Sequence, residues 1–400
     1  MGSRRFTTGL LVIFAALALV VSASASTTNV IYTFAGGNDG EYADTDLVVD
    51  SAGVIYGTTV QGGLHGGGTV FQLAPSATGW HHTVLYNFTG GSDGGFPFTD
   101  LTSDGAGNLY GTTQHGGLYG GGVVFEMIHS PSGWTESVLQ SFPTGPHLIS
   151  AGPSRVTLNG GKIYGTTSYG GAFGHGAVFE LRKSAKGWRG NILYNFTEGS
   201  DGGYPSGGLA FDAQGNLYGT TEWAGSGGGG VIFELTPSNG AWTETVLYSF
   251  QCCTNGDGAV ASGLTISKAG NLYGTTTQGG TGTCAGYYGR GTVWELAHSS
   301  TGWTEIVLHE FAGGSDGNWP NSDLLLNRAG IFGTTRGVVD GDAVVFQLTP
   351  SGNGWTNTVL LDYGVSGALY GGLISGPNGS FYGSRFGGGQ NDGYVFQVLP

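Results

Sequence analysis

A tetrapeptide that recurs at a nearly constant interval constrains the fold of this 400-residue chain more than any other feature. Tyr-Gly-Thr-Thr occurs five times, becomes Phe-Gly-Thr-Thr in a sixth copy and degenerates to Tyr-Gly-Ser-Arg in a seventh. The copies begin at Tyr56, Tyr110, Tyr164, Tyr218, Tyr273, Phe332 and Tyr382. Successive copies lie 50 to 59 residues apart, a period typical of folds built from one supersecondary unit per repeat.

Each copy contains four short segments typical of β-strands. In the second copy these are residues 101–103, 108–113, 123–127 and 135–142, which are rich in aromatic or β-branched residues and separated by Gly, Asn, Asp, Ser and Pro. No copy shows a sustained helical period, which excludes a helical solenoid. Four antiparallel strands in a repeat of this length predict one blade of a β-propeller. We therefore predict an all-β, seven-bladed propeller.

The two ends of the chain predict how the ring closes. The first six copies end in a strand that contains a Trp, whereas the seventh stops at Pro400 before any such strand. The segment that begins at Asn29, Asn-Val-Ile-Tyr-Thr-Phe, matches the missing strand. Because an unpaired sheet edge promotes aggregation, we expect this segment to complete the last blade. Residues 26–400 are then one propeller domain.

The composition excludes the other common classes of fold. Gly accounts for 82 residues and charged residues for only 10%, which disfavours exposed helices. The 12% of aromatic residues excludes a disordered chain, and the lack of Gly at every third position excludes collagen.

The N-terminus predicts export. Arg4 and Arg5 precede an apolar run over residues 10–21, and small residues up to Ala25 follow, which together indicate a signal peptide over residues 1–25. The apolar run is too short to span a bilayer, so we expect an extracellular or periplasmic protein without membrane insertion after cleavage. Without the two arginines the net charge is −16, against −14 for the whole chain. This acidity disfavours nucleic acid as a partner, and we expect a monomer that binds carbohydrate or an extracellular protein.

The recurring segments Leu-Tyr-Gly-Thr-Thr, Gly-Gly, Val-Phe-Glu-Leu and Gly-Trp-Thr-Glu-Thr-Val-Leu-Tyr-Ser-Phe resemble the GloVer-type tandem repeat of exported bacterial proteins. The resemblance covers nearly all of the chain after residue 25 and implies a propeller, but no particular activity. A looser similarity to kelch repeats implies the same fold. Residues that recur in every copy, such as the strand aromatics, are therefore interpreted as packing between blades.

Candidate ligand-binding residues are those that differ between copies. The loop that enters each blade and the loop between its second and third strands are expected on one face of the ring, which we call the upper face. Just before the inner strand, three copies carry Asp46, Asp100 and Asp323, and the aligned position of the third copy is Arg155. The three Asp belong to copies close together in the closed ring, so we expect them to gather at the channel mouth. Aromatic residues are expected on the same rim, at Tyr42, Phe96, Tyr204 and Trp319.

A second set of carboxylates lies in the loops that enter the blades: Asp39, Asp93, Asp201, Asp257 and Asp316. Carboxylates of this kind are ligands for hard cations, so Ca²⁺ is the candidate metal, although no cofactor is evident. The alternative is that each Asp caps its own turn through side-chain hydrogen bonds.

The three cysteines fall in one copy. Cys252 and Cys253 lie in the loop that enters the fifth blade, and Cys284 lies in the enlarged loop between its second and third strands. In an exported protein this arrangement predicts a disulfide from Cys284 to Cys252 or Cys253, with Cys253 preferred.

No catalytic motif accompanies these residues. The sequence contains no His-Glu-x-x-His, Gly-x-Ser-x-Gly or Cys-x-x-Cys segment. We therefore expect a non-catalytic module that recognises carbohydrate or another extracellular polymer on the upper face. Two alternatives remain: a polysaccharide lyase or hydrolase that uses the channel-mouth carboxylates, and a cell-surface structural or protein-interaction scaffold.

Overall fold

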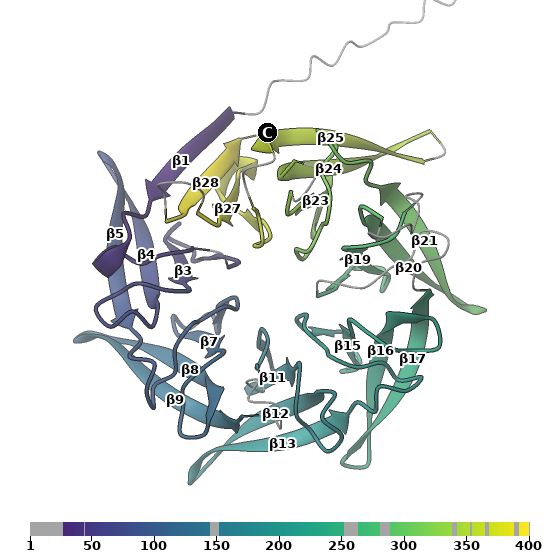
Figure 1. The fold of residues 1–400 in the computed structure, drawn as a ribbon, viewed down its shortest axis with the longest axis horizontal. Helices are drawn as coiled ribbons and strands as arrows, with labels where there is room; N and C mark the ends of the chain where they lie inside the picture. Colours follow the sequence, from purple (N-terminus) through teal and green to yellow (C-terminus); the bar gives the residue numbers. More distant parts are fainter. Residues whose placement is uncertain are drawn as a thin grey trace, which may run out of the picture.

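The computed structural model describes residues 27–43, 45–144, 152–251, 263–280, 289–337, 342–352, 354–364, 368–387 and 392–399. These residues form seven antiparallel sheets of four strands each, arranged in a ring (Figure 1). The predicted seven-bladed propeller is confirmed. A search of the described residues for a long apolar helix that could span a membrane finds none. The predicted signal peptide, residues 1–25, lies outside the described part of the chain.

Blades 1 to 6 each run from an inner strand to an outer strand in chain order. Blade 1 contains β2 (Val48–Val49), β3 (Ile55–Thr59), β4 (Thr69–Ser76) and β5 (Gly79–Asn87). Blade 2 contains β6 (Thr102–Ser103), β7 (Leu109–Thr113), β8 (Gly120–Ser130) and β9 (Gly133–Pro143). Blade 3 contains β10 (Thr157–Asn159), β11 (Lys162–Thr167), β12 (Ala177–Ser184) and β13 (Gly187–Asn195).

The next three blades have the same order. Blade 4 contains β14 (Ala210–Phe211), β15 (Leu217–Thr220), β16 (Gly228–Ser238) and β17 (Ala241–Gln251). Blade 5 contains β18 (Thr265–Ile266), β19 (Leu272–Thr276), β20 (Thr292–Ser299) and β21 (Gly302–Glu310). Blade 6 contains β22 (Leu325–Asn327), β23 (Gly330–Thr334), β24 (Val344–Ser351) and β25 (Gly354–Asp362). Short 3-10 turns occur at η1 (Gly37–Asp39) and η3 (Pro377–Gly379).

Blade 7 is built from both ends of the chain, as predicted. It contains β26 (Ile374–Ser375), β27 (Phe381–Arg385), β28 (Tyr394–Leu399) and, as its outer strand, β1 (Thr27–Thr33). β1 pairs antiparallel with β28, with Val30 opposite Phe396, and Figure 1 shows β1 along the outside of β28. The N-terminal strand therefore closes the ring.

The repeated tetrapeptide has a packing role. Its Gly lies in the second strand of each blade, directly opposite the aromatic residue of the third strand, as Gly111 lies opposite Phe125. A Cβ atom on Gly111 would lie only 2.6 Å from the Phe125 ring, so no other residue fits. Equivalent distances at the other six copies are between 2.3 and 2.6 Å. The motif therefore recurs because every blade buries a ring across this position.

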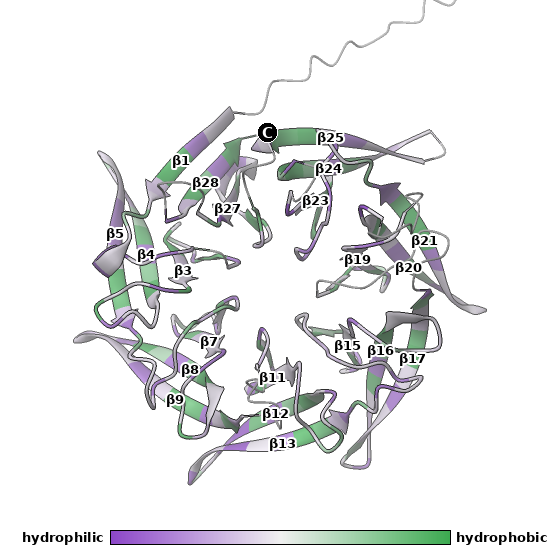
Figure 2. Ribbon diagram, in the orientation of Figure 1, coloured by the Kyte–Doolittle hydropathy of each residue, from purple (hydrophilic) through white to green (hydrophobic). Residues whose placement is uncertain are grey.

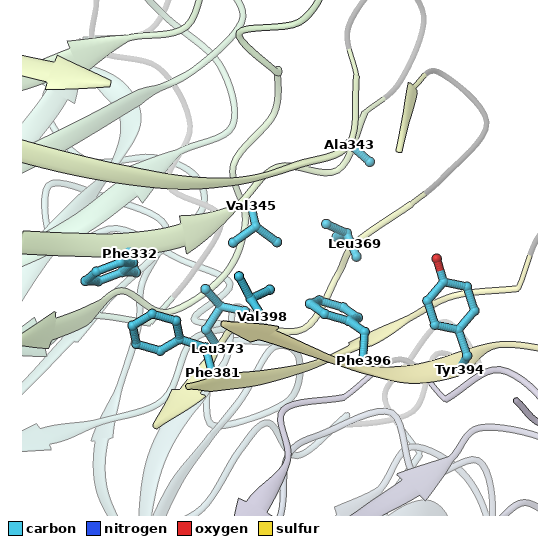
Figure 3. Close-up of a cluster of buried hydrophobic side chains, with 9 residues drawn as sticks. All are labelled: Phe332, Ala343, Val345, Leu369, Leu373, Phe381, Tyr394, Phe396 and Val398. Atoms are coloured by element: carbon cyan, nitrogen blue, oxygen red, sulfur yellow. The ribbon is translucent and has the colours of Figure 1, made fainter. Parts of the chain in front are cut away.

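The hydrophobic core lies between neighbouring blades. Figure 3 shows one such cluster, in which Phe332 and Val345 of blade 6 pack with Phe381 and Phe396 of blade 7. Figure 2 shows the corresponding concentration of hydrophobic residues on the strands. The outer-strand Trp of one blade contacts the repeat Tyr of the preceding blade, as Trp134 contacts Tyr56 with ring centroids 5.8 Å apart. These contacts support the interpretation of the recurring aromatics as packing between blades.

Pairing between loops defines the upper face. The loop that enters a blade forms a β-bridge with the loop between the second and third strands of the same blade, as Gly95 does with His115 and Gly203 with Trp223. The two kinds of loop therefore share one face, as expected. The short turns between the first and second strands and between the third and fourth lie on the opposite face, which we call the lower face.

Candidate functional site

Seven equivalent residues surround the central axis where the inner strands begin on the upper face. Each one precedes a buried apolar residue, such as Leu47, Leu101 or Val156, which anchors the backbone in the core. We call this set the channel-mouth ring; it consists of Asp46, Asp100, Arg155, Gly208, Gly263, Asp323 and Gly372. Because buried and channel-facing residues alternate along an extended strand, the ring side chains face the channel.

Arg155 joins the three Asp of the ring. Its Nη1 atom lies 2.5 Å from the Asp323 Oδ2 atom, 3.4 Å from the Asp46 Oδ2 atom and 3.5 Å from the Asp100 Oδ2 atom. The expected gathering of the three carboxylates is therefore present. Sequence reasoning placed Arg155 in the ring, but not at the centre of the cluster.

Each Asp also accepts a hydrogen bond from the backbone of the preceding blade. The Asp46 N–H donates to the Asp100 Oδ1 atom at 2.6 Å, and the Gly372 N–H donates to Asp46. The Gly263 N–H donates to Asp323 in the same way. A Cβ atom on Gly263 would lie 2.5 Å from the Asp323 Oδ1 atom, so glycine leaves room for the neighbouring carboxylate. A glycine in one blade therefore makes room for the Asp side chain of the next blade.

The electrostatics of the ring are dominated by removal from bulk water. Burial raises the pKa of Asp46 well above its usual value, and the Asp100 and Asp323 charges raise it further, against the opposing effect of Arg155. Burial also raises the pKa of Asp323, while Arg155 lowers it. Burial opposes the charge of Arg155, but the three carboxylates raise its pKa above the usual value for arginine. Arg155 therefore stays charged, and Asp46 holds a proton more readily than an ordinary Asp.

A cavity of about 220 Å³ opens at this ring. The four charged ring residues line it together with polar groups of Thr99, Ser206 and Asn321 and the aromatic rings of Phe98 and Tyr370. A second cavity of about 380 Å³, lined by residues from the inner strands, also includes Arg155 and Asp323 in its wall. A small polar cavity with two aromatic walls is typical of a ligand site.

Phe98, Asn321 and Tyr370 were missed by sequence reasoning. Each lies two residues before a ring position, so the alternation of an extended strand directs it toward the same cavity. The copies differ at this position, where Pro153 and Ser206 are the equivalent residues. Comparing the copies at the position two residues before each ring residue would have identified these three side chains.

The predicted rim aromatics lie in the upper-face loops that enter their blades. Tyr42, Phe96, Tyr204 and Trp319 all have positive φ, between 54° and 61°. Each donates its backbone N–H to a carbonyl of the preceding blade, as Phe96 does to Gly67 at 2.8 Å. The four side chains are half-buried at the seams between blades and do not line the channel-mouth cavity. The backbone bonds to the preceding blade explain why aromatic residues recur at this loop position. A role of these four residues in ligand binding stays a prediction.

The described loop carboxylates cap their own turns. Asp93 accepts hydrogen bonds from the Thr89 N–H at 2.8 Å and from the Tyr86 hydroxyl at 3.1 Å, and Asp201 makes the same contacts with Thr197 and Tyr194. Asp39 and Asp316 are held similarly. This geometry supports the turn-capping alternative. Within the described ranges, no three His, Cys, Asp or Glu side chains are grouped so that they can hold a metal ion.

Four of the predicted residues cannot be placed. Asp257, Cys252 and Cys253 lie outside the described residues. Cys284 also lies outside them. The predicted disulfide and the fifth loop carboxylate therefore remain predictions.

Comparisons with known proteins agree with the fold. The sequence profile of the Gloeobacter/Verrucomicrobia repeat matches residues 19–146 and 128–285, together more than half of the chain. No curated protein sequence matches. Among solved structures, a polysaccharide lyase described as an ulvan lyase superposes with a TM-score of 0.59 at 11% identity, covering 92% of this chain and 95% of the lyase. A candidate 6-phosphogluconolactonase of Bacteroides fragilis NCTC 9343 superposes with a TM-score of 0.52 at 13% identity, covering 84% and 94%.

Proposed function

The chain belongs to the Gloeobacter/Verrucomicrobia repeat family, and we propose that this member is an exported module that binds a carbohydrate polymer at the mouth of its propeller channel. The observation that carries the proposal is the cavity at the channel-mouth ring, in which four charged side chains stand beside Phe98 and Tyr370. Carboxylates accept hydrogen bonds from sugar hydroxyls, and aromatic rings pack on the apolar faces of sugar rings.

The charge of the cavity narrows the class of carbohydrate. Three carboxylates face one guanidinium, so the site favours neutral or amino-bearing sugars and repels uronates and sulfated sugars. The exposed ring of Phe98, with 42% of its surface accessible, supplies a contact surface at the rim of the cavity. The ligand that we propose is a neutral glycan, one sugar unit of which enters the cavity.

One observation favours the enzymatic alternative. Burial raises the pKa of Asp46 and so favours the protonated form that a general acid needs, and Asp100 lies beside it. One observation argues against catalysis. The Asp46 Oδ1 atom accepts the Gly372 N–H and its Oδ2 atom lies near Arg155, so both oxygens already have partners within the protein. We therefore place a hydrolase second to a binding module.

The test is a binding measurement on a panel of neutral, amino-bearing and anionic glycans, with the purified wild-type protein and the Asp100→Asn variant. We expect selective binding of a neutral or amino-bearing glycan by the wild type and a loss of about tenfold or more in the variant, as for a lost charge-assisted hydrogen bond. Each mixture is also assayed for new reducing ends and for unsaturated products. Product formation would favour the enzymatic alternative.

Asp212→Asn is the matched control. Asp212 directly follows the inner strand of blade 4 on the lower face, where it caps the turn to Asn216. We expect this variant to bind the glycan like the wild type. Equal weakening by both substitutions, or no binding to any glycan, would contradict the proposed site and favour a scaffold.

A further inference from the structure

The outer hairpin of blade 3, formed by β12 and β13, differs in charge from all its equivalents. It carries Arg182, Lys183, Lys186 and Arg189. The corresponding outer strand pairs of the other six blades contain no Lys or Arg. Because six copies show what the fold requires at this position, the four cations of blade 3 are not needed to form a blade.

The cations are placed at some cost to folding. Lys162 of β11 pairs with Arg182 of β12, and Arg182 pairs with Arg189 of β13, so three like charges lie abreast across the sheet. Like charges directly opposite each other destabilise a sheet. All four hairpin cations are exposed; Arg182 is paired with Glu180, whereas the charges of Lys183, Lys186 and Arg189 are available to a partner.

The buried carboxylate nearby does not account for these charges. Glu180 binds the Lys162 Nζ atom at 3.0 Å and also contacts Arg182. The equivalent Glu126 and Glu234 are held by the hydroxyls of Tyr110 and Tyr218, at 2.7 and 2.9 Å, with no Lys or Arg among these partners. A Glu at this position therefore does not require a cation. Lys183, Lys186 and Arg189 have no such pairing with Glu180 in any case.

An aromatic platform and a cavity lie beside the cations. The Lys183 Nζ atom lies 5.8 Å from the centre of the Trp188 ring. Trp188 lines a cavity of about 430 Å³ between blades 2 and 3, together with Tyr110, the Gly160–Gly161 turn and two charged side chains, Lys162 and Asp104. Lys183 lies directly opposite Trp188 in the hairpin, so these two side chains share one face of the sheet, whereas Arg189 lies on the other face. The cavity therefore combines an apolar ring face with backbone polar groups and with Lys162 and Lys183, against the single carboxylate of Asp104.

We propose that this lower-face site, formed by the cavity at Trp188 and by Lys183 and Lys186 of the hairpin, binds an anionic polysaccharide rich in uronate residues. A uronate carries a carboxylate and an apolar ring face on the same unit, which matches a cation beside a Trp ring. The hairpin tip, Ser184 to Gly187, carries no large apolar residue that would insert into a membrane. The site lies on the face opposite the acidic channel mouth, so the two proposed ligands differ in charge and do not compete for space.

The test compares two double variants for binding to polygalacturonate at low salt. Lys183→Gln with Lys186→Gln removes two cations from the hairpin beside Trp188; Lys268→Gln with Arg328→Gln removes two cations from exposed lower-face turns of blades 5 and 6. We expect the hairpin variant to bind roughly tenfold more weakly and the control variant to bind within about twofold of the wild type. Added salt should weaken wild-type binding.

Four further measurements decide the interpretation: melting temperatures, binding by Asp100→Asn, and wild-type binding to a neutral β-glucan and to DNA. Unchanged melting temperatures for both double variants show that the loss is one of binding. Asp100→Asn should leave polygalacturonate binding intact, which separates this site from the channel mouth. Equal loss in both double variants, equal affinity of the wild type for a neutral β-glucan, or tighter binding to a single-stranded DNA oligomer would overturn the proposal.

Discussion

Two sets of carboxylates on the upper face use the same residue type in different ways. Each loop carboxylate, such as Asp93, accepts a backbone N–H four residues earlier in its own loop and a hydroxyl or imidazole N–H from the strand before it. The carboxylates of the channel-mouth ring accept bonds from the backbone of the preceding blade and meet at Arg155. The first set recurs in four described blades, whereas the second forms a single cluster.

The comparison shows how to separate structural from functional residues in a repeat protein. A residue that recurs with the same local contacts stabilises each copy. A residue that replaces Gly in some copies, as Asp46, Asp100 and Asp323 do, acquires its contacts only when the ring closes. Such residues are free to differ between copies and are therefore better candidates for binding.

The largest expected effect is that of Arg155→Met. Three carboxylates would lose their shared cation, so we expect the free energy of unfolding to fall by about 3 kcal/mol or more at neutral pH. The loss should shrink at acid pH, because protonation of the carboxyls removes their repulsion. Urea denaturation at both pH values measures this, with the exposed Arg189→Met as the control. A pH-independent loss, or one no larger than that of the control, would show that the ring does not depend on the Arg155 charge.

Asp93→Ala and Asp201→Ala should each lower the free energy of unfolding by about 2 kcal/mol, by similar amounts in blades 2 and 4, because the two carboxylates share their bonds from a Thr and a Tyr. Although burial opposes ionisation, bonds from Thr89 and Tyr86 hold the pKa of Asp93 below its usual value, and those from Thr197 and Tyr194 do so for Asp201. The stabilisation is therefore present at neutral pH and lost as the pH falls through the lowered pKa. Thermal unfolding of both variants from neutral to acid pH tests this. Clearly unequal losses in the two blades would contradict purely local capping.

Glu136→Gln and Glu244→Gln should stabilise the protein at alkaline pH by on the order of 1 kcal/mol. Burial and the Asp93 charge raise the pKa of Glu136 to about 7, and burial and Asp201 do the same for Glu244. With a raised pKa, the protonated Glu favours the folded state at low pH, and this contribution is lost as the pH rises through 7.

The amide of Gln would replace the lost proton, as Asn357 donates to Asp316 at 2.8 Å in blade 6. Melting temperatures at acid and alkaline pH provide the measurement, and at acid pH variant and wild type should agree. Destabilisation at alkaline pH would mean that the ionised Glu is preferred there.

The smallest effect on stability is expected for Asp100→Asn. The amide oxygen can still accept the Asp46 N–H, so the free energy of unfolding should stay within about 1 kcal/mol of that of the wild type. Chemical denaturation measures this beside the glycan assay. A loss as large as that of Asp93→Ala would erase the distinction between the two sets and favour a structural role for the ring.

Much of the fold and part of the site could be predicted from the sequence. The spacing of the repeat indicated seven blades, and the truncated seventh copy indicated that residues near Asn29 would close the ring. Ring closure in turn placed Asp46, Asp100 and Asp323 near one another. The central place of Arg155 was not predicted, because it depends on how far one side chain reaches across the channel to Asp323 of blade 6.

The aromatic residues that line the cavity could not be identified from the sequence pattern. Tyr42 and Phe96 were predicted on the rim beside the carboxylates; their positive φ values and their backbone bonds to the preceding blade describe their loops, and a role of their rings in binding stays a prediction. Phe98 and Tyr370 line the cavity instead. The choice between neighbouring aromatics depends on the backbone path of the loop, which local sequence does not reveal.

The sequence by itself determined the blade: its four strands, its turns and the Gly opposite each buried aromatic, because these depend on contacts within one repeat or between identical neighbours. The tertiary structure alone decided the joining of Asp46, Asp100 and Asp323 at Arg155 and the line of cations across blade 3. Charges and cavities depend on distances between residues far apart in the chain, and those distances exist only once the ring is closed.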